Sequence, residues 1–330
     1  MGSVIKWGIL GTGRIAKKFA EDLQYVQHAQ LIAVGSRSQQ SADVFASQFQ
    51  LAKSYDSYEA LVQDAEVDVI YIATPHVFHY ENTLLCLHHN KAVLCEKPFA
   101  MNRKQVAGMI ETARRKNVFL MEALWTKFLP HYHAMMELVA NGTIGEVVAV
   151  QANFGFKTTE QSNKRLTEIS LGGGTLLDIG IYNVFMALSV LGKPAGIEAA
   201  MKKSVEGVDE QCAITFTYNN GAMAQLFSTF NATIPIEVHL FGSKGNLKLS
   251  HRFYEPSCEI FVSEHSGSEY KKVEVAKTQG TGYEYEAQHV TDCLLKGLKE
   301  SPVLSFDDSL LLIETLDAIR NAGGLVYEAD

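Results

Sequence analysis

The stretch VLCEKPFA, residues 93–100, places an acid and a base at the end of an apolar run. Lys97 stands where a buried strand is expected to end, and an ammonium group there can stabilise the negative charge that develops on a reacting oxygen. The alternative is that Lys97 pairs with a neighbouring carboxylate and serves only the fold.

The stretch GGGTLLDIGIYN, residues 172–183, supplies a second candidate pair. Asp178 and Tyr182 are four residues apart, so they share one face of a helix that starts near Thr175. A phenol, with an ordinary pKa of about 10, becomes a workable acid/base when a nearby cation such as Lys97 lowers that pKa. Two alternatives stay open: Thr175 and Asp178 have the spacing of a capping box, and Tyr182 has the composition of a core aromatic.

The composition is that of a globular protein with room for two domains. The chain has 330 residues, of which 47% are hydrophobic and 20% charged, and its formal net charge is −8. This charge argues against nucleic-acid binding, which requires a basic surface. The five cysteines are scattered, and the apolar N-terminal run is too short for a signal peptide, so we expect a cytoplasmic protein.

The first 122 residues alternate strand and helix patterns. Apolar strands are expected at 4–9, 31–34, 67–74, 92–95 and 118–121, with helices at 15–23, 41–49, 80–90 and 103–116 between them. This order predicts a doubly wound parallel sheet, the Rossmann type of α/β fold, with ligands at the carboxyl ends of its strands.

The glycine-rich stretch GTGRIA follows the first strand directly. Gly11 is expected to make the turn, and Gly13 lets the backbone approach a pyrophosphate. Free amides at the start of the helix then bind the anion. The predicted cofactor contacts here are Gly11, Thr12, Gly13, Arg14 and Ile15. A structural turn without a ligand is the alternative.

The second strand ends in VGSRSQQ, without the acidic residue that binds the ribose of NAD. Ser36 and Arg37 occupy the position where the 2′-phosphate of NADP would lie, and a guanidinium matches a phosphate well. We therefore expect NADP to bind at least about tenfold more tightly than NAD, the difference of one charge-assisted contact. NAD remains the alternative if Arg37 only faces solvent.

Two histidines occur in TPHVFH, after the third long strand. Thr74, Pro75, His76 and His79 are expected at the edge of the cofactor. A metal site is not expected, because no cysteine or acid accompanies the histidines at ligand spacing.

The second part of the chain has a different pattern. Strand-like runs are expected at 146–156, 197–204, 210–218, 222–230, 235–241 and 258–263, and helices at 131–141, 175–190, 283–299 and 307–320. Most runs alternate apolar and polar residues, which is typical of antiparallel strands with one buried face. We therefore predict a Rossmann domain at 1–122 and an α+β domain at 123–330 with an open, mainly antiparallel sheet, whose C-terminal helix can pack back on the first domain.

The order GTGRIA, SRS, TPHVFH, EKP and DIGIY resembles the Gfo/Idh/MocA family of oxidoreductases over essentially the whole chain. The stretches at 122–130 and 172–182 are most similar to its branch of dimeric dihydrodiol dehydrogenases and NADP-dependent D-xylose dehydrogenases. The resemblance implies that Glu96 and Lys97 lie at the cofactor, that Lys97 also acts on the substrate, and that Tyr182 is the acid/base.

The resemblance also implies residues of the substrate pocket and an assembly. Trp125, Phe154 and Phe156 are expected to line the pocket, although ordinary core packing is the alternative. Lys127 stands where the branch commonly has arginine, so a bidentate substrate contact is in doubt. Homodimerisation through the sheet of the second domain is expected.

Together these features predict an NADP(H)-dependent oxidoreductase that acts on a secondary alcohol of a cyclic polyol, foremost a pyranose sugar. Tyr182 accepts the hydroxyl proton, Lys97 stabilises the oxyanion and Asp178 holds a second hydroxyl. The alternatives are a trans-dihydrodiol dehydrogenase, an anhydrofructose-type reductase and a non-catalytic dinucleotide sensor. Specificity is expected in the loop at 157–171.

Overall fold

The computed structural model describes residues 3–158, 164–264 and 269–330. The chain forms two compact units, the first made of Met1–Phe128 and Thr278–Leu310, the second of Leu129–Lys277 and Leu311–Asp330. The chain thus returns to the first unit late and leaves it again within its last helix. The division of function between residues 1–122 and 123–330 stays a prediction, as does the docking of the C-terminal helix.

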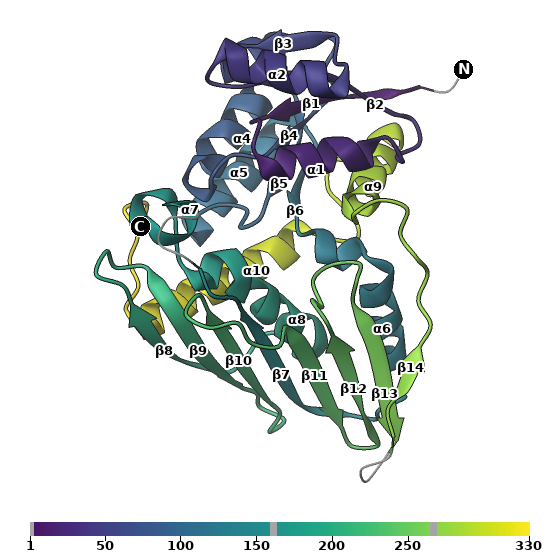
Figure 1. Ribbon diagram of the computed structural model, residues 1–330, viewed down its shortest axis with the longest axis vertical. Coiled ribbons are helices and arrows are strands. Elements are labelled where there is room, and N and C mark those ends of the chain that lie inside the picture. Colours follow the sequence, from purple (N-terminus) through teal and green to yellow (C-terminus); the bar gives the residue numbers. More distant parts are fainter. Residues whose placement is uncertain (1–2, 159–163, 265–268) are drawn as a thin grey trace. The chain divides into compact units, whose positions relative to one another are not determined.

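The first unit is built on a parallel sheet of six strands in the order β3–β2–β1–β4–β5–β6 (Figure 1). The strands are β1 (Ile5–Leu10), β2 (Ala29–Gly35), β3 (Lys53–Tyr55), β4 (Val69–Ile72), β5 (Ala92–Glu96) and β6 (Leu120–Ala123). The order reverses next to β1, which is where doubly wound sheets bind ligands. The predicted doubly wound sheet is confirmed; only the three-residue β3 was not expected.

The helices of the first unit connect these strands. They are α1 (Arg14–Leu23), α2 (Gln39–Phe49), α3 (Tyr58–Gln63), α4 (His79–His88), α5 (Arg103–Lys116) and α9 (Tyr283–Leu295). Helix α4 packs against α5, and α1 against the late helix α9. The buried rings of Phe19 and Tyr71 stack at 3.7 Å between centroids, so α1 is fixed to the centre of the sheet.

The register of the sheet brings the loops of interest to one edge. Leu10, at the end of β1, pairs with Gly35 on β2 and with Ile72 on β4. Ile72 in turn pairs with Cys95 on β5. The loops that follow β1, β2, β4 and β5 therefore leave the sheet side by side.

The second unit contains an eight-stranded sheet in the order β14–β13–β12–β11–β7–β10–β9–β8. Its strands are β7 (Val147–Gly155), β8 (Gly196–Lys203), β9 (Asp209–Thr217), β10 (Met223–Thr229), β11 (Glu237–Gly242), β12 (Gly245–Ser250), β13 (Glu259–Glu264) and β14 (Lys271–Val273). Only β7 and β10 pair in parallel, so the predicted open, mainly antiparallel sheet is confirmed. Strands β12 and β14 were not expected.

Helices cover one face of this sheet. The second unit holds α6 (Pro130–Ala140), α7 (Lys164–Thr167), a 3₁₀ turn at Ile169–Leu171, α8 (Ile181–Leu191) and most of α10 (Phe306–Gly323). The first unit has 3₁₀ turns at His76–Phe78 and Trp125–Phe128. Helix α8 packs against β7 and β10, and α6 against β13. The predicted helix at 175–190 is wrong in one respect: its first part, Leu176–Gly180, is a π-helical turn, and α8 begins only after it.

One segment among the described residues, Ile169–Leu191, is long and apolar enough to cross a membrane, with a mean hydropathy of 1.6. It is 78% buried inside the protein, which is how the core helix of a globular unit behaves. The cytoplasmic location stays a prediction.

Candidate active site

The loop after β1 has the geometry of a pyrophosphate site. Gly11 has a φ of +108°, a conformation that favours glycine, and a Cβ there would come within 3.0 Å of the Ala73 carbonyl oxygen. A Cβ on Gly13 would meet nothing within 4 Å, so the space above the loop is open. Helix α1 begins at the next residue, and no side chain in the described part of the chain caps its N-terminus. Its free amides fit a dinucleotide pyrophosphate.

The end of β2 offers a cation rather than an acid. Ser36 is buried and Arg37 exposed. The first acid after them, Asp43, lies in α2, where it accepts hydrogen bonds of 2.6 Å each from Gln39 Nε2 and Ser54 Oγ. Tyr58, at the start of α3, lies within reach of the Arg37 charge, which opposes the burial that raises the pKa of this phenol. These groups fit a 2′-phosphate better than a ribose hydroxyl.

A histidine joins the loop after β4 to the turn formed by EKP, residues 96–98, called the EKP turn below. The buried His79 ring has Nδ1 2.8 Å from the Pro98 carbonyl oxygen and Nε2 2.9 Å from that of Thr74. Both partners are acceptors, so the ring can donate to one of them while it contacts both loops. His76, two residues after Thr74, is also buried. Within residues 3–158, 164–264 and 269–330 no three His, Cys, Asp or Glu side chains gather as a metal site.

The EKP turn rests on buried carboxyl groups. Glu96 accepts a hydrogen bond from the Tyr71 hydroxyl and another, of 3.2 Å, from the backbone N–H of Lys97. Two residues further on, the Phe99 N–H donates to Glu122 Oε1 at 3.1 Å. The acid of this pair thus points inward and fixes the turn, which leaves Lys97 as the half-buried member.

Glu122 carries a second contact that ties the turn to another element. Its Oε2 accepts a 2.7 Å hydrogen bond from Ser309, in the first turn of α10. Burial raises the pKa of Glu122 to about 7, while the positive charge of Lys97 acts in the opposite direction. Burial also raises the pKa of Glu286, on α9, well above its usual value. The charge of Lys97 therefore acts on Glu122, which belongs to a buried acidic group with Glu96 and Glu286.

Two residues expected at the substrate are packed within the first unit. Trp125 is 5% exposed, and its ring stacks on Tyr283 with centroids 4.3 Å apart. Lys127 forms an ion pair with Asp308 at 3.1 Å. Their contribution to substrate binding stays a prediction.

Tyr182 lies in an aromatic cluster of the second unit. Its ring centroid is 5.1 Å from that of Tyr254 and 6.0 Å from that of Phe154. Phe154 in turn stacks on Tyr254 at 4.6 Å and lies 6.4 Å from Phe156. Phe154, named from the sequence, thus packs against Tyr182 together with Tyr254, and Phe156 packs behind Phe154 and against Phe230. Burial raises the pKa of Tyr254 to about 12, so its phenol keeps its proton at neutral pH.

Asp178 does not form the capping box that its spacing suggested. Its Oδ1 stands 2.9 Å from Arg165 Nη1 in an ion pair. The Thr175 hydroxyl donates instead to Asp209, at 2.7 Å. The π-helical turn that carries Asp178 leads directly into α8, and Tyr182 is the second residue of that helix. π-turns occur often at functional sites.

Asp209, at the start of β9, holds the beginning of that turn. Its Oδ2 accepts from both the Thr175 hydroxyl and the Leu176 N–H, at 2.7 Å each. Gly174 lies so close that a Cβ would overlap Asp209 Oδ1, and its φ of +124° also favours glycine. Asp209 is fully buried, and burial raises its pKa to about 6. The glycine run of this stretch is therefore required by packing.

This buried carboxyl gives a testable dependence of stability on pH. Its pKa is about 6 in the folded protein and 3.8 without burial. Between these pH values the folded state binds more protons than the unfolded state, so the folded state loses stability as the pH rises. We expect the free energy of unfolding of the wild type, relative to Asp209→Asn, to fall by about 2 kcal/mol from about pH 4 to about pH 7. Denaturant unfolding of both proteins measures this difference. Glu206→Gln, at an exposed neighbour, is the control; a difference independent of pH would contradict the assignment.

The chain matches two consecutive parts of one protein family. Residues 5–124 match the oxidoreductase family with an NAD-binding Rossmann fold, and residues 132–248 match the GFO/IDH/MocA C-terminal domain. The chain belongs to the Gfo/Idh/MocA family. As a member, it is an NAD(P)-binding oxidoreductase, which agrees with the open glycine loop and the uncapped helix behind it.

Curated relatives within the family share one activity. The chain is 40% identical to trans-1,2-dihydrobenzene-1,2-diol dehydrogenase of Xenopus laevis over 98% of its own length and 99% of that protein. It is 36% identical to the enzyme of the same name from Bos taurus, over 99% of each chain. It is thus a homologue of dihydrodiol dehydrogenases.

Solved structures of two other oxidoreductases share the fold. The 3-ketoreductase KijD10 of Actinomadura kijaniata, in complex with NADP and TDP-benzene, is 25% identical with a TM-score of 0.87 over 97% of this chain and 98% of that one. The aldose-aldose oxidoreductase of Caulobacter crescentus is 23% identical with a TM-score of 0.88 over the same shares. The second likeness concerns the fold alone.

Several residues that contact the proposed site residues or support their loops were not predicted as site residues from the sequence. They are Tyr58, Glu122, Arg165, Asp209 and Tyr254. Each contacts a residue that is distant in the sequence or lies outside any motif, as Asp209 does when it accepts a hydrogen bond from Thr175. The predicted specificity loop at 157–171 includes residues 159–163, which lie outside the described part of the chain.

Proposed function

We propose that this Gfo/Idh/MocA protein is an NADP(H)-dependent dehydrogenase of a secondary alcohol on a six-membered ring that carries a neighbouring hydroxyl. The observation that carries the proposal is the setting of Tyr182, a tyrosine within an aromatic cluster with an ionised Asp178 one turn before it. Aromatic side chains suit the apolar face of a ring, and a carboxylate suits its hydroxyls. The dihydrodiol dehydrogenases among its relatives act on a substrate of this kind, according to their name.

The roles in the reaction follow from the chemistry of the side chains. In oxidation Tyr182 accepts the proton of the reacting hydroxyl, and Asp178 accepts a hydrogen bond from the adjacent one. The Lys97 ammonium stabilises the oxygen as it becomes negative. The dinucleotide, when bound, would supply the hydride acceptor. Gly11–Ile15 hold the pyrophosphate and Ser36 with Arg37 the 2′-phosphate; Thr74, Pro75, His76 and His79 border the cofactor.

Cofactor preference and turnover can be tested together. NADPH and NADH are titrated by nicotinamide fluorescence, and pyranoses and trans-dihydrodiols are then supplied with NADP. We expect NADPH to bind at least about tenfold more tightly than NADH, with the preference lost in Arg37→Leu. Equal affinities for both cofactors would contradict the assignment of NADP. Tight binding without turnover of any compound would favour a dinucleotide sensor.

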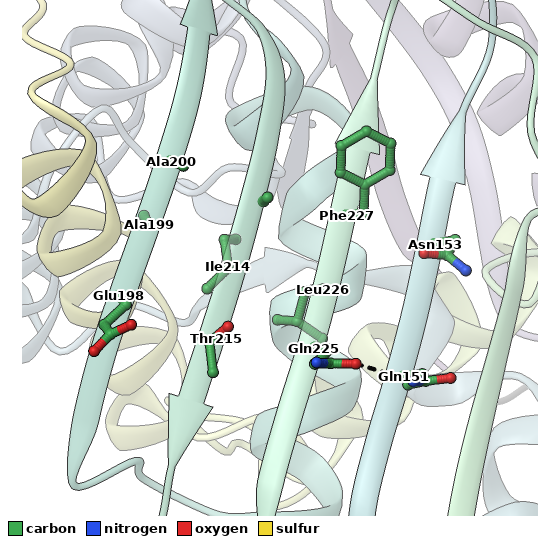
Figure 2. A pocket seen from close by; sticks show the side chains of 11 residues that line it. Gln151, Asn153, Glu198, Ala199, Ala200, Ile214, Thr215, Gln225, Leu226 and Phe227 are labelled. Atoms are coloured by element: carbon green, nitrogen blue, oxygen red, sulfur yellow. Dashed lines mark hydrogen bonds between the residues drawn. The ribbon is translucent and has the colours of Figure 1, made fainter.

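We also propose a homodimer through the open face of the second unit's sheet. This face carries a hollow over β7–β10 (Figure 2), lined by Gln151, Asn153, Glu198, Ala199, Ala200, Ala213, Ile214, Thr215, Gln225, Leu226 and Phe227. Glu198 is the one charged residue among these eleven, and Gln151 and Gln225 are hydrogen-bonded to each other at 3.0 Å across neighbouring strands. Interface cores are depleted of charge in the same way. We expect sedimentation equilibrium to give a dimer, and Ala213→Arg to give a monomer; a monomeric wild type would contradict the proposal.

A further inference from the structure

The segment that follows α10 returns to the glycine run at 172–174. The buried Tyr327 hydroxyl donates a 2.7 Å hydrogen bond to the carbonyl oxygen of Gly173. The N–H of the same glycine donates to the Glu168 carbonyl at 3.0 Å. Both polar groups of the Gly173 backbone are therefore bonded, one to the loop before it and the other to a side chain 154 residues further along the chain.

Tyr327 is itself fixed by a buried arginine of α10. The guanidinium carbon of Arg320 lies 5.4 Å from the centroid of the Tyr327 ring. Arg320 donates to Asp330 and to Asp317, at 2.6 Å each. The backbone N–H of Tyr327 donates to the same oxygen of Asp330, at 2.9 Å. The ring and the backbone of Tyr327 are thus both tied to Arg320, which makes its hydroxyl a rigid support for Gly173.

The Tyr327 hydroxyl lies beside the carboxyl group that holds the π-helical turn. A Cβ on Gly174 would come within 3.1 Å of this hydroxyl and would overlap Asp209 Oδ1. Burial raises the pKa of the Tyr327 phenol well above its usual value, and the charge of Asp209 acts in the same direction. The phenol therefore keeps its proton and stays a donor. Tyr327 and Asp209 support the glycine run at the same point of the chain.

The turn supported in this way carries the proposed reacting groups. The two residues after the glycine run each bond to Asp209 at 2.7 Å. The π-helical turn Leu176–Gly180 then contains Asp178, and Tyr182 is the second residue of α8. The direction of a side chain on a helical turn depends on the register of that turn. A change at the start of the turn therefore moves both reacting groups.

We infer that Tyr327 is a positioning residue of the reaction, whose hydroxyl acts through Gly173 to fix the turn that presents Asp178 and Tyr182. This inference rests on the proposed function, because it takes Tyr182 as the acid/base. A misplacement of about 1 Å in a reacting group can cost about a hundredfold in rate. One hydrogen bond behind the turn is thus expected to affect kcat, although Tyr327 itself does not take part in the chemistry.

Tyr327→Phe removes this hydrogen bond and keeps the ring against Arg320. With NADP and either D-xylose or trans-1,2-dihydrobenzene-1,2-diol, whichever reacts faster, we expect kcat to fall by about tenfold and the Kd of NADPH to stay unchanged. Tyr132→Phe is the matched control, because it deletes the hydroxyl of another buried tyrosine of the second unit, bonded to Ser189 at 3.0 Å. Its kcat should stay within about twofold of the wild type. A wild-type kcat in Tyr327→Phe would overturn the inference.

A double-mutant cycle separates positioning from a general loss of structure. In the Tyr182→Phe background the proton acceptor is already absent, so Tyr327→Phe should lower the residual kcat by no more than about twofold. A variant that merely contains less folded protein loses the same factor in both backgrounds. Equal losses of about tenfold in the two backgrounds would therefore show a structural role and overturn the inference.

Hydrogen exchange separates this inference from the proposed function. We expect the amides of residues 174–180 to exchange about tenfold faster in Tyr327→Phe than in the wild type, with the amides of α6 unchanged. Unchanged exchange at 174–180 would overturn the inference even in a variant of reduced activity. Faster exchange there, in a protein whose wild type oxidises neither D-xylose nor the dihydrodiol, would overturn the proposed function and leave the support of the turn by Tyr327 in place.

Discussion

Tyr182→Phe is expected to lower kcat by about three orders of magnitude, because it removes the group that accepts the hydroxyl proton. The ring stays, and with it the packing against Phe154 and Tyr254, so the fold and the affinity for NADPH should be unchanged. Steady-state kinetics with the best substrate of the panel, together with NADPH titration, measure both effects. The loss should appear in kcat and kcat/KM alike, as for an interaction made in the transition state.

A second tyrosine of the same unit provides the control. The Tyr132 hydroxyl donates to Ser189 Oγ at 3.0 Å, and its ring lies 5.4 Å from that of Phe185. Tyr132→Phe deletes the same atom from a packed tyrosine and should leave kcat within about twofold, at a cost of roughly 1 kcal/mol of stability. A wild-type rate in Tyr182→Phe, with the large loss in Tyr254→Phe instead, would assign the acid/base to Tyr254. The high pKa of Tyr254 argues against that outcome.

The strands and loops of the first unit could be predicted because their signals are local. The run VDVIYIAT is nearly continuously apolar, as expected of a strand covered on both faces, and glycines follow β1 where the backbone must turn. The same holds for the alternating strand QCAITFTY of the second unit. By contrast, β12 has the sequence GNLKLS. Only two apolar side chains, Leu247 and Leu249, mark its buried face, and this pattern is too short to predict a strand.

The supports of the site could not be predicted because they come from distant parts of the chain. Thr175 looked like a helix cap for Asp178, yet its hydroxyl is taken by Asp209, which is 34 residues away. Glu122 bonds to Ser309 across 187 residues. The π-helical turn before α8 has no sequence signal either. The side chain that holds its start, Asp209, lies on another element. Motifs thus indicate the proposed reacting groups, whereas the positions of these groups depend on tertiary contacts.

Strand β5 has a lysine at each end, and the two differ in what surrounds them. Lys91, just before the strand, is buried and donates to the carbonyl oxygens of Asp64, at 2.5 Å, and Val67, at 2.7 Å. Burial lowers the pKa of Lys91. Lys97 follows the strand at the carboxyl edge, beside the loops of the cofactor, with Glu96 and Glu122 holding the backbone on either side of it. The first lysine stabilises the sheet, and the second is the one proposed to act in the reaction.

Lys97→Met is expected to reduce kcat by about two to three orders of magnitude, because no cation then stabilises the oxyanion. Stability should change little, since the bonds of Glu96 and Glu122 in this turn are made to backbone N–H groups and hydroxyls. Lys91→Met should do the reverse: kcat within about twofold, and a loss of stability of roughly 1–3 kcal/mol from two unpaired carbonyls. Kinetics and thermal unfolding of the two variants form a crossed comparison. If Lys97→Met were as active as the wild type and only less stable, Lys97 would be a structural lysine like Lys91, and the oxyanion would need another donor.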